Sequence, residues 1–263
     1  MFQGYFMKIG LICCLIAAIL SGCGTVNSSN PAKQADLLVS AAASLQDSMK
    51  EVAEAYAKKH PNVKLTFNFG SSGALQQQIE QGAPADLFLS AGAKQMAALI
   101  DKGFVDSGQQ SVLLSNSLVV IVPADSKKEI AAMEDLGKAE VTKIAMGEVD
   151  TVPAGTYAKE ALSHYKLWDS IQPKLIFTKD VRQVLSYVES GNVDAGIVYS
   201  TDVLNSNKAR VALKAESGSH KPIQYPAGIV KASKQPSEAA EFYKYLQGEE
   251  ASAIFAKFGF MKP

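Results

Sequence analysis

Short apolar runs alternate along this chain with segments whose apolar residues recur at helical spacing. The apolar runs are the expected strands, at residues 37–39, 63–69, 86–90, 117–123, 143–147, 175–177, 195–199 and 225–230. The segments with helical spacing are the expected helices, at residues 44–59, 73–82, 93–102, 129–138, 153–165, 180–191 and 237–248, with a last one around 254–258. Strands that alternate with helices in this way predict an α/β fold with mostly parallel sheets.

Small and helix-capping residues occupy four of the turns that join a strand to the next helix. These turns lie at residues 41–47, 70–73, 150–155 and 180–183. In the first turn we expect Ser44 to start a helix, with Asp47 at the capping-box position; an N-cap role alone is the alternative for Ser44. The first-turn N–H groups of a helix have no intrahelical partner and lie at the positive end of its dipole. A strand end followed by a helix start is therefore suited to an anion.

The order of these turns along the chain predicts how they are arranged. Two precede residue 117 and two follow it. In open α/β sheets, ligands bind beyond the carboxyl ends of the strands, against helix N-termini. The pattern therefore predicts two lobes with an anion site in the cleft between them.

The N-terminal segment has the pattern of a targeting signal. Lys8 precedes an apolar run of the length of a signal-peptide core, which is too short to span a bilayer. The run ends in Leu20-Ser21-Gly22-Cys23, which resembles the bacterial lipoprotein signal, in which the Cys is lipidated and becomes the first mature residue. A plain secretory cleavage site is the alternative, and Met7 is an alternative start to Met1.

From this pattern we expect a signal peptide over residues 1–22, a lipid anchor on Cys23 and a flexible tether over residues 23–35. The expected location is the cell membrane, with the lipid-anchored protein facing the extracytoplasmic side. Cys13 and Cys14 then lie in the removed segment, so the folded domain can hold neither a disulfide nor a thiolate metal site.

Charge and residue chemistry exclude several classes of protein. The 26 acidic residues balance the 26 basic ones, which does not favour nucleic acid as a partner. The three histidines, His60, His164 and His220, are scattered and lie in none of the four turns. Gly70-Ser71-Ser72-Gly73 is not the Gly-x-Ser-x-Gly turn of a serine hydrolase. We therefore expect a protein that is not an enzyme.

Six segments, in order and at consistent spacing, resemble the molybdate-binding proteins of bacterial ABC importers. They are Ala41–Leu45, Gly82–Phe88, Asn116–Val120, Val152–Leu162, Asp180–Arg182 and Gly196–Tyr199. The resemblance covers residues 36–263 and implies the two-lobe fold of type II periplasmic binding proteins, each lobe a mostly parallel sheet flanked by helices. Lobe 1 is expected to comprise residues 36–117 and 225–263, and lobe 2 residues 118–224.

The resemblance also implies a function. Such a protein captures molybdate, and also tungstate, between its lobes and delivers it to the permease and ATPase subunits of the transporter, without a cofactor. Closure of the lobes is expected to bend the chain near Asn116–Val122 and Gln224–Gly228. A tethered two-lobe binder favours a monomer.

The resemblance carries a ligand set onto positions of this sequence. The oxyanion ligands, which are equally the groups around the molybdate metal, would be Ser44, Ser72, Ala154, Val181 and Tyr199. Backbone N–H groups would serve at the two aliphatic positions, so an apolar side chain there is no objection. Ser71 is the alternative to Ser72, and Tyr199 could instead be an aromatic cover of the core. Arg182 could be a counter-charge in the cleft or could point to solvent, and is left outside the predicted site.

A site of hydroxyl and N–H donors, with no Lys or Arg, should bind a fully ionised dianion. A protonated oxyanion such as hydrogen phosphate would bring an O–H that finds no acceptor, at a cost of about 1–3 kcal/mol. Sulfate is also a bare dianion, so a binding protein for sulfate or thiosulfate is the alternative. A carboxylate binder usually has a bidentate Arg, and a structural surface lipoprotein would not need four such turns.

Overall fold

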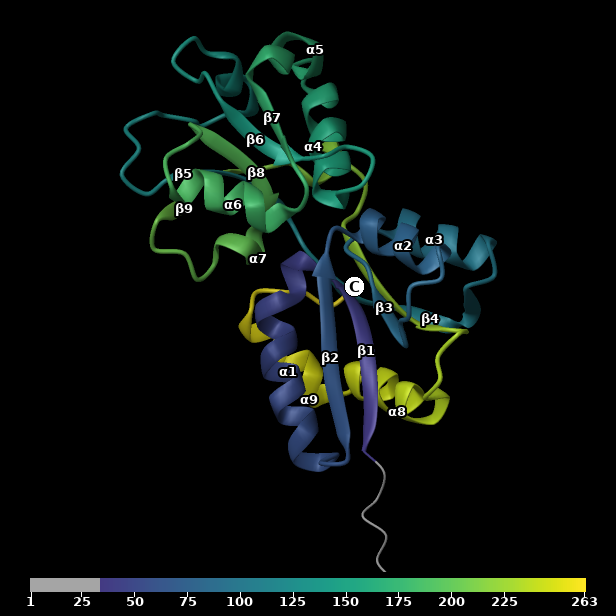
Figure 1. The fold of residues 1–263 in the computed structure, drawn as a ribbon. Helices are drawn as coiled ribbons and strands as arrows, with labels where there is room; N and C mark the ends of the chain where they lie inside the picture. Colours follow the sequence, from purple (N-terminus) through teal and green to yellow (C-terminus); the bar gives the residue numbers. More distant parts are fainter. Residues whose placement is uncertain (1–33) are drawn as a thin grey trace, which may run out of the picture. The chain divides into compact units, whose positions relative to one another are not determined.

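The computed structural model describes residues 34–263, and these form one compact unit (Figure 1). The predicted signal peptide, the anchor residue Cys23 and the predicted tether up to Lys33 lie outside the described residues. The unit contains its own hydrophobic cores, so we expect it to fold without the segment that precedes it. Within residues 34–263, no helix has both the length and the apolar character that a membrane crossing requires.

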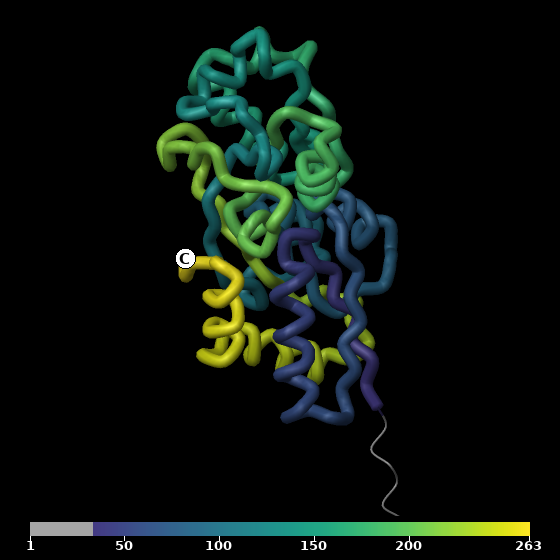
Figure 2. Tube along the Cα trace, turned by 90° about the vertical axis from the view of Figure 1, so that its left-hand side faces the viewer, coloured from purple at the N-terminus to yellow at the C-terminus, as the bar shows by residue number. Residues whose placement is uncertain are grey.

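The first lobe is built on a five-stranded sheet in the order β2-β1-β3-β10-β4 (Figure 1). Its strands are β1 (Ala35–Ala42), β2 (Val63–Gly70), β3 (Leu87–Leu89), β4 (Val105–Ser115) and β10 (Gln224–Val230). Its helices are α1 (Gln46–Lys59), α2 (Ser72–Glu80), α3 (Ala93–Asp101), α8 (Pro236–Leu246) and α9 (Glu249–Lys257). Figure 2 shows the C-terminal helices beside α1, which α9 contacts. The C-terminal segment is thus part of the first lobe.

The second lobe has the same plan, with a five-stranded sheet in the order β7-β6-β8-β5-β9. Its strands are β5 (Leu118–Pro123), β6 (Ile144–Gly147), β7 (Leu175–Thr178), β8 (Ala195–Tyr199) and β9 (Ala209–Lys214). Its helices are α4 (Pro153–His164), α5 (Trp168–Ile171), α6 (Val181–Glu189) and α7 (Ser200–Val203). Two α/β lobes are therefore present, as the sequence predicted.

One strand in each sheet runs against the others. In the first lobe β10 pairs antiparallel with β3 and β4, and in the second lobe β5 pairs antiparallel with β8 and β9. These two strands are the first that the chain forms after it changes lobes. It leaves the first sheet at Ser115, enters the second at Leu118, and returns between Lys214 and Gln224. The predicted bending segments, Asn116–Val122 and Gln224–Gly228, overlap these two strands.

Three local predictions were wrong. Helical spacing over residues 129–138 gives only a short 3-10 helix, Met133–Gly137. Two strands were missed, β4 and β9, because neither is a continuous apolar run: most of their residues are partly or fully exposed, as expected at a sheet edge. The first helix begins with a 3-10 turn, η1 (Ala43–Leu45), and its α-helical part starts only at Gln46.

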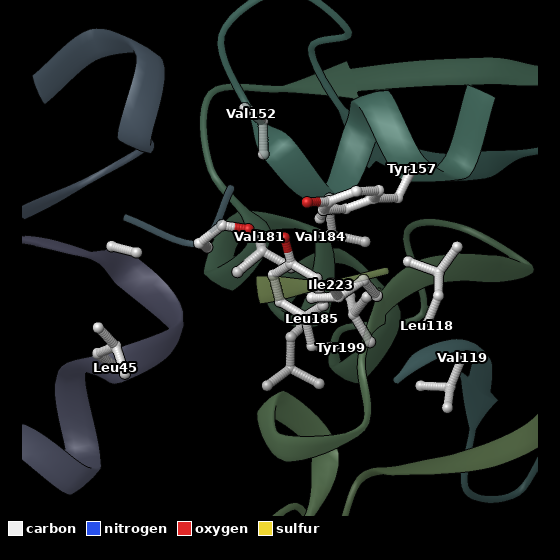
Figure 3. Close-up of a cluster of buried hydrophobic side chains, with 14 of the residues drawn as sticks. Leu45, Leu118, Val119, Val152, Tyr157, Val181, Val184, Leu185, Tyr199 and Ile223 are labelled. Atoms are coloured by element: carbon white, nitrogen blue, oxygen red, sulfur yellow. Dashed lines mark hydrogen bonds between the residues drawn. The ribbon is translucent and has the colours of Figure 1, made fainter. Parts of the chain in front are cut away.

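The largest hydrophobic core contains side chains from both sheets, and Figure 3 shows part of it. Leu45 from the first lobe is drawn there with Val152, Val181 and Tyr199 from the second. A smaller core lies between α2, α3 and the first sheet. The large core therefore extends up to the surfaces where the two lobes meet.

Candidate functional site

A small cavity lies where the ends of several strands and helices from both lobes converge. The space between the lining side chains is small, with room for about one water molecule. All five predicted ligand residues line it. From the first lobe these are Ser44 and Ser72, and from the second Ala154, Val181 and Tyr199. Each is buried, with at most 4% of its surface exposed. The cavity is therefore small and is lined by residues of both lobes.

Three helices begin at this cavity. Ser72 is the first residue of α2, Ala154 the second of α4 and Val181 the first of α6. Pro153 occupies the first position of α4, where its missing N–H costs nothing, as the sequence predicted. First-turn N–H groups have no acceptor within their own helix. The cavity therefore gathers backbone donors and the positive ends of three helix dipoles.

The structure gives the two neighbouring serines different tasks. The side chain of Ser71 caps α2 by accepting from the N–H of Ala74 at 3.4 Å. The Oγ of Ser72 accepts from the N–H of Ala91 at 2.9 Å and is fully buried. A hydroxyl that already accepts a hydrogen bond keeps its proton free to donate. This geometry favours Ser72 as the donor to a ligand.

Ser44 does not cap the first helix, so the predicted capping box is wrong. The cap position is Leu45, without a side-chain hydrogen bond. The Oγ of Ser44 instead lies 3.0 Å from the hydroxyl of Tyr225, on β10. The 3-10 turn at Ala43–Leu45 delays the start of the α-helix and leaves the Ser44 side chain buried beside the cavity.

The partners of Tyr225 determine which way these hydroxyl protons point. Asn116 Nδ2 can only donate, and it lies 3.3 Å from the Tyr225 hydroxyl. The single proton of Tyr225 is then free for Ser44 Oγ, and the proton of Ser44 for the cavity. Burial raises the pKa of Tyr225 well above its ordinary value, so the phenol keeps that proton. Asn116 and Tyr225 thus orient Ser44 as a donor.

Tyr199 lies at the end of β8 and is fully buried. Its hydroxyl donates to the carbonyl oxygen of Ala91, on the other lobe, at 3.2 Å. Burial raises the pKa of Tyr199 well above its ordinary value, so it remains a neutral donor. An anion in the cavity would have to take this proton from the carbonyl of Ala91.

Within residues 34–263, the side chains that line the cavity include no cation and a single charged group, Asp180. Asp180 Oδ1 accepts from the N–H of Gln183 at 2.9 Å and so caps α6, as the sequence predicted. For Arg182 the sequence left two alternatives, a counter-charge in the cleft or a side chain in solvent. The structure shows neither: Arg182 does not line the cavity, and its side chain is bonded across the lobes. Its Nη2 donates to Asp47 Oδ2 on the first lobe at 2.6 Å. The anion-binding character of the cavity therefore comes from dipoles and hydrogen-bond donors.

Backbone contacts bring the lobes together beside the cavity. The N–H of Gly73, in α2, donates to the carbonyl oxygen of Thr151 of the second lobe at 2.9 Å. A Cβ on Gly73 would lie 2.5 Å from that oxygen, so only glycine fits.

Elsewhere, a larger cavity of about 420 Å³ includes Lys94, Tyr157 and Lys221 but none of the predicted ligand residues. Within residues 34–263, no group of three His, Cys, Asp or Glu side chains could hold a metal ion.

A family model described as "Bacterial extracellular solute-binding protein" matches residues 37–261. The chain belongs to this family. YvgL of Bacillus subtilis, which carries the provisional name of an ABC transporter substrate-binding lipoprotein, is 44% identical to this solute-binding protein over 99% of both chains. The molybdate-binding protein ModA of Haemophilus influenzae is 39% identical, over 87% of this chain and 91% of its own.

The solved periplasmic molybdate-binding protein of Azotobacter vinelandii shares the fold of this solute-binding protein. Its TM-score is 0.79 at 24% identity, with 86% of this chain and 99% of that chain covered. The fold is therefore that of the type II periplasmic binding proteins, as the sequence predicted.

The contacts that sequence reasoning missed join residues far apart in the chain. Tyr225 and Asn116 lie 181 and 72 residues beyond Ser44, and nothing in their local pattern links them to it. The ion pair between Asp47 and Arg182 offered a weak signal, because two residues of opposite charge stand close in sequence to two predicted ligand residues, Ser44 and Val181.

Proposed function

We propose that this solute-binding protein captures molybdate, and tungstate, as a bare dianion in the cavity between its lobes. The observation that carries the proposal is the convergence of three helix N-termini and two oriented serine hydroxyls on one buried cavity, whose lining in the described part of the chain contains no cation. The 39% identical relative named as a molybdate-binding protein supports the choice of ion. No cofactor and no catalytic step are needed for this function.

The proposed ligands are the hydroxyls of Ser44, Ser72 and Tyr199 and the backbone N–H groups of Ala154 and Val181. All of these groups are donors, so each can form a hydrogen bond to a fully ionised oxygen of the ligand. Each hydrogen bond to a charged partner is worth roughly 1.5–3 kcal/mol. Hydrogen phosphate would place its own O–H against donors and lose about 1–3 kcal/mol. Discrimination against sulfate has to come from the size of the cavity, because sulfate carries the same charge.

The wider setting of the proposal follows from the family and the N-terminal sequence. We propose that the loaded protein, as a monomer, delivers its ion to the permease and ATPase subunits of an ABC importer. The 44% identical relative named as a lipoprotein agrees with a lipid anchor on Cys23 at the outer side of the cell membrane. Replacement Cys23→Ser should move the protein from the membrane fraction to the soluble fraction, and continued retention would contradict the anchor.

Titration calorimetry of the chain from Gly24 onward tests the function directly. We expect tight one-to-one binding of molybdate and tungstate and little heat with phosphate. Ser44→Ala and Ser72→Ala should each weaken molybdate binding by about tenfold or more while thermal unfolding stays close to that of the parent. Sulfate binding as tight as molybdate binding would support the alternative, a sulfate or thiosulfate protein. No heat with any of these ions would refute the proposed site.

A further inference from the structure

Arg182 connects the two lobes outside the cavity. It is the second residue of α6, and its Nη2 donates to Asp47 Oδ2 of α1 at 2.6 Å. Its Nε donates to the carbonyl oxygen of Ala43 at 3.4 Å. The Arg182 side chain is 28% exposed and that of Asp47 is 41% exposed, so the pair lies at the rim of the contact between the lobes.

A second acidic residue, Asp202, lies behind Arg182 on the same lobe. Asp202 Oδ1 is 3.9 Å from Arg182 Nε, and the Asp202 side chain is fully buried. Its other oxygen, Oδ2, accepts from the N–H of Tyr199 at 3.0 Å. Oδ1 has no hydrogen-bond partner within the part of the chain that the structure describes. Arg182 therefore has one acidic neighbour on each lobe. It forms a hydrogen bond to Asp47 of the first lobe, whereas Asp202 of its own lobe lies beyond hydrogen-bond distance.

The sequence neighbours of these groups are the proposed ligands. Arg182 follows Val181, and Ala43, whose carbonyl Arg182 binds, precedes Ser44. The contact thus ties the first turn of α6 to the turn that carries Ser44. Separation of the lobes has to break the bonds to Asp47 and Ala43, whereas Asp202 moves with Arg182.

We propose that Arg182 is a positioning residue for ion capture, which holds the lobes closed through Asp47 and Ala43 and turns back to Asp202 when they part. The effect on ligand binding rests on the proposed function; the effect on closure does not. A contact made only in the closed state slows release of the ion. For a partly exposed ion pair, we expect its loss to speed release about twofold to fivefold.

Spin labels can follow closure directly. The chain from Gly24 onward contains no cysteine. The exposed residues Asp101, on the first lobe, and Asp169, on the second, can be replaced by labelled cysteines. Electron–electron distances are then measured with and without molybdate in the parent, in Asp47→Ala, in Arg182→Ala and in the double variant.

Lys50→Ala is the matched control. Lys50 Nζ lies 3.9 Å from the same Asp47 carboxylate, but it belongs to the same helix and does not cross between the lobes. We expect both single variants, but not the control, to shift the ion-free distances toward longer values and to speed molybdate release in stopped-flow measurements. The ion-free distances and the release rate of the double variant should differ little from those of Arg182→Ala, because both substitutions remove the same ion pair.

Two results separate this proposal from the proposed function. If the parent binds molybdate but both single variants match it in distances and release rate, the role of Arg182 is refuted and the ion site stands. If the parent binds no oxyanion, the function fails, and the ion-free distances alone decide for or against the contact between lobes. An equal shift in Lys50→Ala would attribute the effect to surface charge and overturn the proposal.

Discussion

Gly73→Ala should weaken ion binding without weakening the fold. The added Cβ would lie 2.5 Å from the carbonyl oxygen of Thr151 and 2.7 Å from its Cα. Both are backbone atoms of the opposite lobe, so no side-chain rotation relieves the contact. To restore an ordinary contact of 3.4 Å, the two backbones must separate by about 0.9 Å.

The cost of that separation can be worked out from the neighbouring contacts. The hydrogen bond from Gly73 N–H to Thr151, now 2.9 Å, would lengthen beyond the usual range, a loss of about 0.5–1.5 kcal/mol. Ser72 would move away from the start of α4 by a similar distance, which weakens its bond to the ion. Together we expect a loss of about tenfold to hundredfold in molybdate affinity.

Stability should change little. Gly73 is the second residue of α2, where the helical preference for alanine over glycine, at most about 1 kcal/mol, offsets much of the lost hydrogen bond to Thr151. Urea unfolding should therefore show Gly73→Ala close to the parent in stability, while calorimetry shows weaker binding. Gly218→Ala is the control, because a Cβ there meets no atom within 4 Å. Unchanged affinity in Gly73→Ala would refute the view that the lobes must close this tightly around the ion.

Three further predictions follow from single contacts. Ser71→Ala should cost about 0.5–1 kcal/mol of stability in urea unfolding, because it removes the cap of α2, but should leave affinity close to the parent; a larger loss of affinity than in Ser72→Ala would reverse the roles of the two serines. Tyr225→Phe should weaken molybdate binding about tenfold in calorimetry, because Ser44 loses its donor; unchanged affinity would contradict the hydroxyl chain from Asn116. Burial, opposed by Arg182 and reinforced by Asp47 and Asp180, raises the pKa of Asp202 to about 7. A pKa that is higher in the folded than in the unfolded state stabilises the fold at acid pH, and this contribution is lost as the pH rises. The free energy of unfolding of the parent should therefore fall by about 1.4 kcal/mol per pH unit relative to Asp202→Asn up to pH 7. A constant difference between the two proteins from pH 5 to pH 7 would disprove the raised pKa.

Local sequence patterns were sufficient to predict the strands and helix starts on which the candidate site is built. Buried strands such as β5 and β8 are continuous apolar runs, and the starts of α4 and α6 are marked by Pro153 and Asp180. Their order along the chain predicted two lobes. The predicted ligand set came from a family resemblance rather than from the pattern itself, and the structure brings all five residues to one cavity.

Local patterns failed where a residue depends on partners far away in the chain. The predicted capping box of the first helix does not form, because the Ser44 hydroxyl lies beside Tyr225 of β10 instead of capping the helix. Asp47 instead pairs with Arg182 of the other lobe. Exposed edge strands such as β4 depend on pairing with β10 rather than on their own apolar content.

Strand β10, which returns to the first sheet after the chain has formed the second lobe, determines the order in which the two sheets can be completed. All the strands of the second lobe occur in sequence before β10, so that lobe can complete its sheet while the C-terminal segment is still emerging from the ribosome or the export channel. The first lobe has to wait, because β10 lies between β3 and β4 and joins them. Until it arrives, β3 and β4 each expose an unpaired edge that can associate with another chain. A chain shortened before Gln224 would therefore retain a complete second sheet and a divided first one, with only half of the ion site formed.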